Sequence, residues 1–196
     1  MAHRGFPSEK FQTEETAMEE SKKHRPKNGR GEEDVRYPTH NVIHRAYRVP
    51  DKNAWTTETH LVDGERVTVQ GLQDKINHGH VLCAELFEEN QRIRLVGTIE
   101  CELEDAHEDE VLIGLFSVEP SYQSKGVGGI LMRAAMKYAK EELHKKTAVL
   151  WIIETRQELI NWYLKLGFVD TKQKVPFVMP HLQKSQFQFV IFKKDL

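Results

Sequence analysis

The amino-acid sequence predicts an α/β fold in which a sheet of mixed strand direction carries helices on its faces. Three strand-like segments follow one another over residues 81–87, 93–103 and 111–118, separated by short polar turns. Consecutive strands with short turns form an antiparallel meander. Further along the chain, apolar strand-like segments alternate with segments in which apolar residues recur every three or four positions, the spacing of amphipathic helices.

Composition fits one soluble domain with an extension. The chain has 196 residues, of which 39% are hydrophobic and 30% are charged, and its formal net charge is −2. That balance lacks the strongly basic face of a nucleic-acid-binding protein. Two cysteines, Cys83 and Cys101, are too few for a disulfide framework and indicate a reducing compartment. No apolar run is long enough to span a membrane. We therefore expect a cytoplasmic protein, with nuclear access left open and with no nucleic-acid or membrane partner.

Residues 1–36 are predicted to form a disordered, charged tail. This segment has few large apolar residues, and its eight Lys or Arg side chains balance eight Asp or Glu side chains. Residues 37–196 are predicted to form the single folded domain.

The first elements of that domain are predicted to be helical. Residues 42–48 either begin or end a helix. Thr68 is a suitable N-cap for a helix that contains Leu72 and Ile76. That helix ends at His78-Gly79-His80, which we interpret as a loop rather than a metal site because no third ligand lies at a useful spacing.

The meander's middle strand alternates clearly, and alternation places successive side chains on opposite faces. One face carries Ile93, Leu95, Gly97, Ile99, Cys101 and Leu103. The other carries Arg94, Val96, Thr98, Glu100, Glu102 and Glu104.

The C-terminal part continues the α/β pattern. Residues 148–153 are continuously apolar, as in a strand buried on both faces. A helix with an apolar side over residues 159–166 follows, and Gly167 is its C-terminal stop. Residues 168–171 begin another strand. A loop containing Pro176 and Pro180 then leads to a final strand over residues 187–192.

A glycine-rich turn, Gln123 to Gly129, joins the third strand of the meander to the next helix. At such a turn the first backbone N–H groups of the helix have no helical partner, and the helix dipole adds partial positive charge. Glycine also allows the backbone to approach a ligand closely. The turn therefore suits a pyrophosphate, although an ordinary glycine-rich turn remains the alternative. Its spacing fits neither a Walker P-loop nor a dinucleotide fingerprint.

The pattern Gln123-x-x-Gly126-x-Gly128 resembles the signature of the GNAT acyl-CoA N-acyltransferases, in which this loop holds the coenzyme A pyrophosphate. Residues 161–168, Asn-Trp-Tyr-Leu-Lys-Leu-Gly-Phe, resemble a second segment of that family. Residues 46–66 and 156–163 are similar to small bacterial and fungal GNAT proteins. The resemblance covers about residues 40–196, and it implies the GNAT fold, a mostly antiparallel sheet of six to seven strands flanked by helices.

The resemblance implies an N-acetyltransferase that moves the acetyl group of acetyl-CoA to a primary amine, either a small molecule or an amino-acid-like acceptor. Transfer would occur by direct attack in a ternary complex, without a metal. The alternative is a non-catalytic GNAT module that binds acyl-CoA as a sensor or regulator. A homodimer is left open, since members of the family often form dimers.

Positions that contact the coenzyme are carried over from the family. Backbone groups of Phe116, Ser117 and Val118 would lie along the pantetheine arm, with an N–H near Val118 as the oxyanion donor. The pyrophosphate would be held by Gln123, Ser124, Lys125, Gly126, Val127, Gly128 and Gly129. Arg156 occupies the position at which many protein-directed members have an Asn that touches the coenzyme arm. That departure lowers the case for an acetyltransferase of ribosomal proteins or protein N-termini.

Tyr163 is the candidate general acid for the coenzyme thiolate, the alternative being a core aromatic residue. Glu100 and Glu102 share a strand face and are candidates for the general base, although exposed carboxylates in such positions are commonly just solvated. Glu58 is better suited to grip a cationic acceptor, and Trp55 and Thr57 would line the same wall. A route through an acyl-cysteine is disfavoured because Cys101 falls on an apolar strand face.

Overall fold

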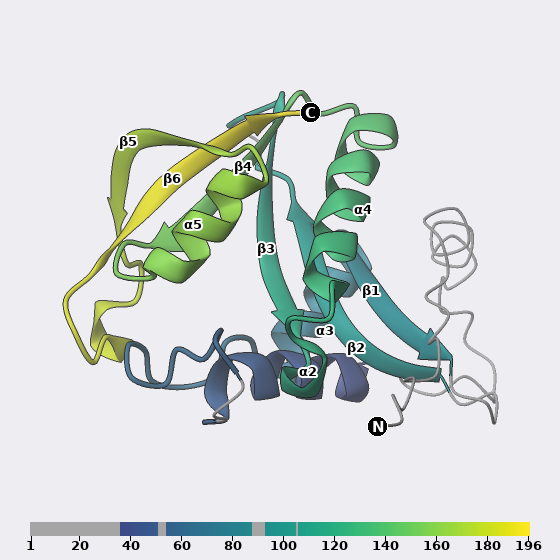
Figure 1. The fold of residues 1–196 in the computed structure, drawn as a ribbon, viewed down its shortest axis with the longest axis vertical. Coiled ribbons are helices and arrows are strands. Elements are labelled where there is room, and N and C mark those ends of the chain that lie inside the picture. Colours follow the sequence, from purple (N-terminus) through teal and green to yellow (C-terminus); the bar gives the residue numbers. More distant parts are fainter. Residues whose placement is uncertain (1–35, 51–53, 88–92, 105) are drawn as a thin grey trace, which may run out of the picture.

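The structure is a computed structural model that describes residues 36–50, 54–87, 93–104 and 106–196 (Figure 1). The tail expected over residues 1–36 therefore lies outside the described residues, apart from Arg36. Two helices come first, α2 (Arg36–Arg48) and α3 (Val69–His78). The segment 42–48 thus ends a helix.

Six strands form one sheet in the order β1-β2-β3-β4-β6-β5. Their bounds are β1 His80–Phe87, β2 Ile93–Glu102, β3 Glu110–Val118, β4 Thr147–Ile153, β5 Val169–Pro176 and β6 Gln188–Asp195. Every neighbouring pair is antiparallel except β3 and β4, which are parallel. This arrangement confirms the predicted α/β fold, with its mostly antiparallel sheet of mixed direction and its N-terminal meander.

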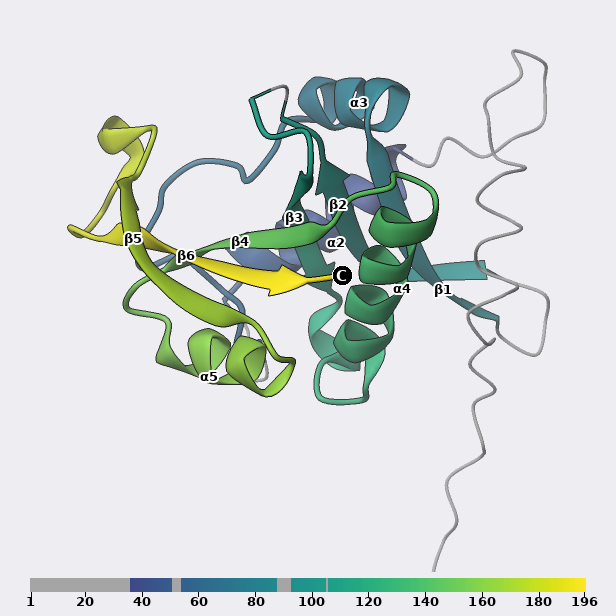
Figure 2. The same cartoon turned by 90° about the horizontal axis from the view of Figure 1, so that it is seen from above.

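Helices cover the sheet from both sides. In Figure 2, α4 (Val127–Glu141) and α5 (Gln157–Lys165) lie on one side of the sheet and α3 lies on the other. The main core fills the space between α4 and the sheet, where Val96, Ile99 and Met132 are almost fully buried. Ile43, Leu72 and Leu115 form a separate cluster that joins α2 and α3 to β3.

The helix ends follow the expected signals. The Thr68 hydroxyl accepts a hydrogen bond from the Gly71 N–H at 3.0 Å, which confirms the predicted N-cap of α3. Gly167, immediately after the end of α5, has a φ of +85°, a conformation that glycine adopts without strain. Pro176 differs from expectation, because it ends β5 opposite Gln188 instead of lying in a loop.

The middle strand of the meander is buried on both faces. Thr98 and Glu100 lie on the face that the sequence assigned to the polar side, yet each is at most 3% exposed. Val96, which the sequence assigned to the same face, packs instead in the main core. Helix α2 packs on β2 and β3, while α3 packs on β1. Alternation along one strand cannot reveal that helices from distant sequence cover its polar face.

Strands β3 and β4 separate partway along their length. Their parallel register covers only Glu110 to Leu112 of β3, and beyond it the two strands diverge (Figure 1). Leu115 has a φ of +38°, and the register of β2 against β3 shifts between Thr98 and Glu100. Beyond Leu112, β3 is therefore not paired with β4.

No helix in the described part of the chain is both long enough and apolar enough to cross a membrane.

Candidate active site

A cavity of about 220 Å³ lies where β3 and β4 diverge. Residues 113–116 of β3 and 150–153 of β4 line its two sides. The glycine turn and the start of α4 form one end. The opposite end is formed by the segments 47–66 and 177–189, which are joined by an isolated bridge between Val62 and Gln183.

The glycine turn leads into the first turn of α4. Gly126 is the N-cap residue and has a φ of +90°, and its carbonyl accepts the first helical hydrogen bond from the Ile130 N–H at 3.1 Å. The N–H groups of residues 127–129 therefore precede the first helical bond. A Cβ at Gly128 would lie 3.3 Å from the Phe116 ring, whereas a Cβ at Gly126 would have no atom within 4 Å. This end of the cavity thus offers N–H donors beside open space.

Five of the seven predicted turn residues line the cavity: Gln123, Ser124, Gly126, Gly128 and Gly129. Lys125 does not: its ammonium lies 4.9 Å from the centre of the Tyr122 ring. Val127 packs in the core at 2% exposure. A side chain is not required at either position for a backbone N–H to reach a ligand, so the turn can still act through its main chain.

Gln123 has a structural task that the sequence did not predict. Its side-chain N–H₂ group donates to the Thr56 hydroxyl at 2.9 Å and to the Val118 carbonyl at 3.0 Å. Its side-chain oxygen accepts from the Trp55 N–H at 3.1 Å. One amide therefore ties the glycine turn both to the end of β3 and to the segment that follows α2.

Phe116 and Val118 line the cavity from β3, but the Ser117 side chain does not. The Ser117 hydroxyl lies 2.6 Å from that of Thr98, on the opposite face of the sheet. The Phe116 carbonyl accepts a hydrogen bond from the Tyr47 hydroxyl at 2.7 Å. Two aromatic side chains thus enclose this stretch, because the Trp162 ring also stacks on Phe116 with 5.7 Å between centroids.

Tyr163 lies on the buried side of α5 and lines the cavity at 6% exposure. Its ring contacts Trp162 and Phe168 edge to face. None of the described residues makes a hydrogen bond to its hydroxyl. Burial raises the pKa of the Tyr163 phenol well above its usual value of 10, and the nearby Tyr47 and Glu58 raise it further. The phenol is therefore protonated at neutral pH and has a proton to donate.

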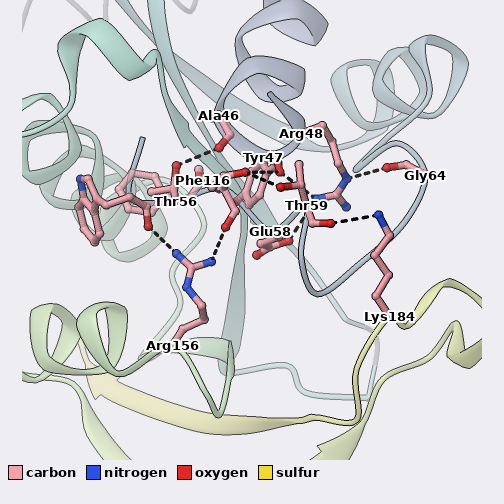
Figure 3. Close-up of polar contacts among 12 residues, drawn as sticks. Ala46, Tyr47, Arg48, Thr56, Glu58, Thr59, Gly64, Phe116, Arg156 and Lys184 are labelled. Atoms are coloured by element: carbon pink, nitrogen blue, oxygen red, sulfur yellow. Dashed lines mark hydrogen bonds and ion pairs between the residues drawn. The ribbon is translucent and has the colours of Figure 1, made fainter. Parts of the chain in front are cut away.

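Arg156 holds the segment after α2 against α5 (Figure 3). Its guanidinium donates to the Trp55 carbonyl at 2.6 Å and to the Thr57 carbonyl at 3.3 Å, and it pairs with Glu158. The residue is 4% exposed and lines the cavity. The sequence resemblance assigned this position to the coenzyme, but the observed donors are directed to the opposite wall.

The three residues expected to bind the acceptor lie on that wall. Trp55 and Glu58 line the cavity, whereas Thr57 does not, because its hydroxyl is directed to the Tyr47 carbonyl at 3.5 Å. The Glu58 carboxylate pairs with Arg48 at 3.4 Å. Arg48 also donates to the Gly64 carbonyl at 2.6 Å, as Figure 3 shows.

Glu100 and Glu102, the predicted bases, face α3 instead of the cavity. Lys75 of α3 reaches both carboxylates, at 2.8 Å and 3.3 Å. Glu100 is 3% exposed, and burial raises its pKa while Lys75 lowers it. Glu100 does not line the cavity, although its carboxylate lies against Gly114, which does. The structure thus does not bring this pair together with Tyr163.

A family model described as acetyltransferase (GNAT) family matches residues 41–168. That range is more than half of the chain and contains β1 to β4, the glycine turn and α5. The chain belongs to the GNAT acetyltransferase family. Membership supports acetyl transfer as the general reaction.

Solved structures share the GNAT fold with this chain. A GNAT acetyltransferase from Bacillus anthracis is 18% identical with a TM-score of 0.51, covering 67% of this chain and 76% of its own. A putative phosphinothricin N-acetyltransferase is 17% identical with a TM-score of 0.59, covering 82% and 93%. A spermidine N-acetyltransferase chimera whose sources include Vibrio cholerae is 15% identical with a TM-score of 0.57, covering 83% and 92%. Identities this low show the fold alone. A search of the curated proteins found no match.

This GNAT domain places further residues in the cavity that the sequence analysis did not single out. Tyr47, Arg48, Glu65 and Arg66 line the end formed by the segments 47–66 and 177–189, and Trp162 also lines the cavity. The resemblance of residues 46–66 to other GNAT proteins indicated that this region as a whole contributes to the site. It gave no indication of which side chains in the region face the cavity.

Neither cysteine lines the cavity. Cys101 is buried in the core, where burial raises the pKa of its thiol to about 12. No group of three or more His, Cys, Asp or Glu side chains in the described segments could hold a metal ion.

Proposed function

We propose that this GNAT domain transfers the acetyl group of acetyl-CoA to a primary amine by direct attack in a ternary complex. The observation that carries the proposal is one continuous cavity with two chemically different ends. One end presents the N–H groups of a glycine turn, and the other presents ionisable side chains. The Tyr163 phenol lines the same cavity.

The residues at the first end fit an acyl-CoA. The open space beside Gly126 accommodates a pyrophosphate, and the N–H groups of residues 127–129 donate to it. Beyond Leu112, β3 is not paired with β4, so its edge can hydrogen-bond an extended pantetheine arm. Bound acetyl-CoA supplies an activated thioester. The proposed oxyanion donor is an N–H near Val118.

The transfer requires the amine in its neutral form, because an alkylammonium has no lone pair to donate. The amine nitrogen forms a bond to the thioester carbonyl carbon, and the bond from that carbon to sulfur breaks. The nitrogen loses a proton, while the departing thiolate takes the Tyr163 phenol proton. The products are an amide and coenzyme A thiol, and Tyr163 regains its proton from solvent. Positioning both reactants in one cavity makes the encounter effectively unimolecular.

Glu58 is the proposed acceptor of the amine proton, directly or through a water molecule. Among the described residues it is one of two carboxylates that line the cavity, and it lies close enough to Tyr163 to affect the pKa of the phenol. Glu100 and Glu102 of β2 each pair with Lys75 of α3 and do not line the cavity. We assign to that pair a structural role in place of the catalytic one expected from the sequence.

The experiment is release of free coenzyme A thiol from acetyl-CoA by the full chain across arylalkylamines, polyamines, amino acids and Lys-containing peptides. We expect amine-dependent release and an acetylated amine detected by mass spectrometry. Tyr163→Phe should lower kcat by about 10²-fold, in the usual range for loss of a general acid, while the Kd for acetyl-CoA is unchanged.

Tyr138→Phe is the matched control. The Tyr138 hydroxyl lies 2.9 Å from the His80 ring, outside the cavity, so this variant should keep the wild-type kcat. Binding of acetyl-CoA without transfer to any amine would contradict the proposal and favour an acyl-CoA sensor.

A further inference from the structure

Arg66 differs from the other two arginines that line the cavity. Arg48 and Arg156 each donate to two backbone carbonyls and pair with a glutamate. The Arg66 guanidinium instead lies against Tyr47, 5.5 Å from the ring centre. Among the described residues, no carboxylate forms an ion pair with Arg66. Arg66 is an exposed residue that lines the cavity, and Glu58 and Glu100 are close enough to raise its pKa.

Arg66 also lies close to the atoms that we expect to react. Tyr47, on which it packs, donates its hydroxyl proton to the Phe116 carbonyl of β3. Glu58, the proposed proton acceptor, is close enough to influence both Tyr47 and Arg66 electrostatically. A group held by Arg66 would therefore lie near an amine placed at Glu58.

The charge at this end does not suit a polycation. Among the described residues that line the cavity, Arg48 and Arg156 pair with Glu58 and Glu158, which leaves Arg66 and Glu65 without an ion-pair partner. An acceptor with several ammonium groups would need a surplus of carboxylates, and it would be repelled by Arg66. An acceptor with one ammonium and one anionic group matches the charges that are present.

Apolar side chains complete the same end of the cavity. They come from β4, from the segment after α2 and from the C-terminal segment. The residues are Val62, Ile153, Phe177, Met179, Leu182 and Phe189. Phe177 and Phe189 contact each other, with 5.8 Å between ring centroids. The C-terminal ones lie beyond the range that the family model matches.

We infer that the acceptor is an amino carboxylate with an apolar side group, whose carboxylate is bound by Arg66 while its amine faces Glu58. A guanidinium suits this role because it can hold a carboxylate through two parallel hydrogen bonds. This inference rests on the proposed function, because it names the acceptor for the same site.

The test compares matched acceptors that differ only in the anionic group. Phenylalanine, leucine and methionine are assayed against their amides, with spermidine as the polycation. We expect kcat/KM of the wild-type chain to be about 10- to 100-fold higher for the acids than for the amides, the range of one charged hydrogen-bonded pair. In Arg66→Gln, kcat/KM for the acids should fall to that for the amides, while kcat/KM for the amides stays unchanged. Arg66→Lys should restore part of the preference.

Arg45→Gln is the matched control, because Arg45 pairs with Glu119 at 2.7 Å away from the cavity and should leave the preference intact. Calorimetric binding of N-acetylphenylalanine to wild type and Arg66→Gln gives a second readout that needs no turnover.

Equal kcat/KM for acids and amides would overturn the inference while leaving acetyl transfer established, as would a preference that survives in Arg66→Gln. If no acceptor is acetylated, the proposed function fails, and the calorimetry then decides the inference by itself. Equal binding to wild type and variant, or binding to neither, would refute it.

Discussion

Replacing Arg156 with methionine separates the role that the structure gives this residue from the one that sequence resemblance implies. The structure shows a buried guanidinium that donates to the carbonyls of Trp55 and Thr57. The resemblance places a coenzyme contact at this position. Arg156→Met keeps a long side chain of similar reach and removes the donors.

The expected loss of stability follows from those two hydrogen bonds. A hydrogen bond to a charged group contributes about 1.5–3 kcal/mol, and the 2.6 Å bond to Trp55 should contribute more than the 3.3 Å bond to Thr57. Removal of a buried charge also recovers part of its desolvation cost. We expect the free energy of unfolding to fall by about 2–3 kcal/mol, and Tm to fall by about 4–12 °C for a chain of this length.

Function should change on one side of the cavity only. The segment that Arg156 anchors carries Glu58, so the acceptor KM should rise by about 10-fold, roughly the effect of about 1.4 kcal/mol. The glycine turn receives no bond from Arg156, so the Kd for acetyl-CoA should stay within about 2-fold. Arg94→Met is the control: Arg94 is an exposed arginine on β2 whose guanidinium lies 5.5 Å from the centre of the Tyr122 ring, and its loss should alter the free energy of unfolding by less than about 1 kcal/mol.

Thermal unfolding, calorimetry with acetyl-CoA and initial rates with a varied acceptor together measure these quantities. A large rise in the Kd for acetyl-CoA, with unchanged acceptor KM and unchanged Tm, would refute this account and support the coenzyme contact.

Three further predictions concern the glycine turn, the buried carboxylate and the general acid. Gly126→Ala should raise the Kd for acetyl-CoA by about 10-fold in calorimetry and destabilise the fold by about 1–2 kcal/mol, because φ is +90° there; an unchanged Kd would mean that the turn is not the pyrophosphate site. Lys75→Met should lower Tm more at about pH 8 than at about pH 5. Burial raises the folded-state pKa of Glu100, so the folded state binds the proton more tightly than the unfolded state, and the free energy of unfolding falls as pH rises through that pKa. This fall is larger in the variant, because Lys75 no longer stabilises the ionised carboxylate. A Tm difference independent of pH would contradict it. Because burial raises the pKa of Tyr163 above 10, the pH–rate profile of the wild type should show no alkaline loss from this phenol below pH 10; a loss that Tyr163→Phe abolishes would show that the phenol ionises earlier.

Much of the fold follows from local patterns that the sequence displays directly. The N-cap at Thr68, the C-terminal stop at Gly167 and the strand–turn–helix around Gly126 each depend on residues only a few positions apart. Such short-range signals favour the same local conformation in most proteins, so the structure agrees with the prediction at these positions.

Contacts between distant segments could not be predicted in the same way. The bond from Arg156 to Trp55 joins residues 101 positions apart, and that from Tyr47 to Phe116 joins residues 69 apart. Glu100 illustrates the consequence: its strand face looked solvated, but α2 and α3 cover the sheet there and Lys75 neutralises the carboxylate. The candidate base therefore moves from Glu100 and Glu102 to Glu58.

The central claim is that one cavity holds acetyl-CoA and an amine together and transfers the acetyl group directly. Initial rates of coenzyme A thiol release, with acetyl-CoA and the acceptor varied against each other, test it most directly. The account predicts amine-dependent release, an acetylated amine by mass spectrometry, and double-reciprocal lines that intersect. Parallel lines would contradict direct attack, and absence of amine-dependent release from a chain that binds acetyl-CoA would contradict transfer itself.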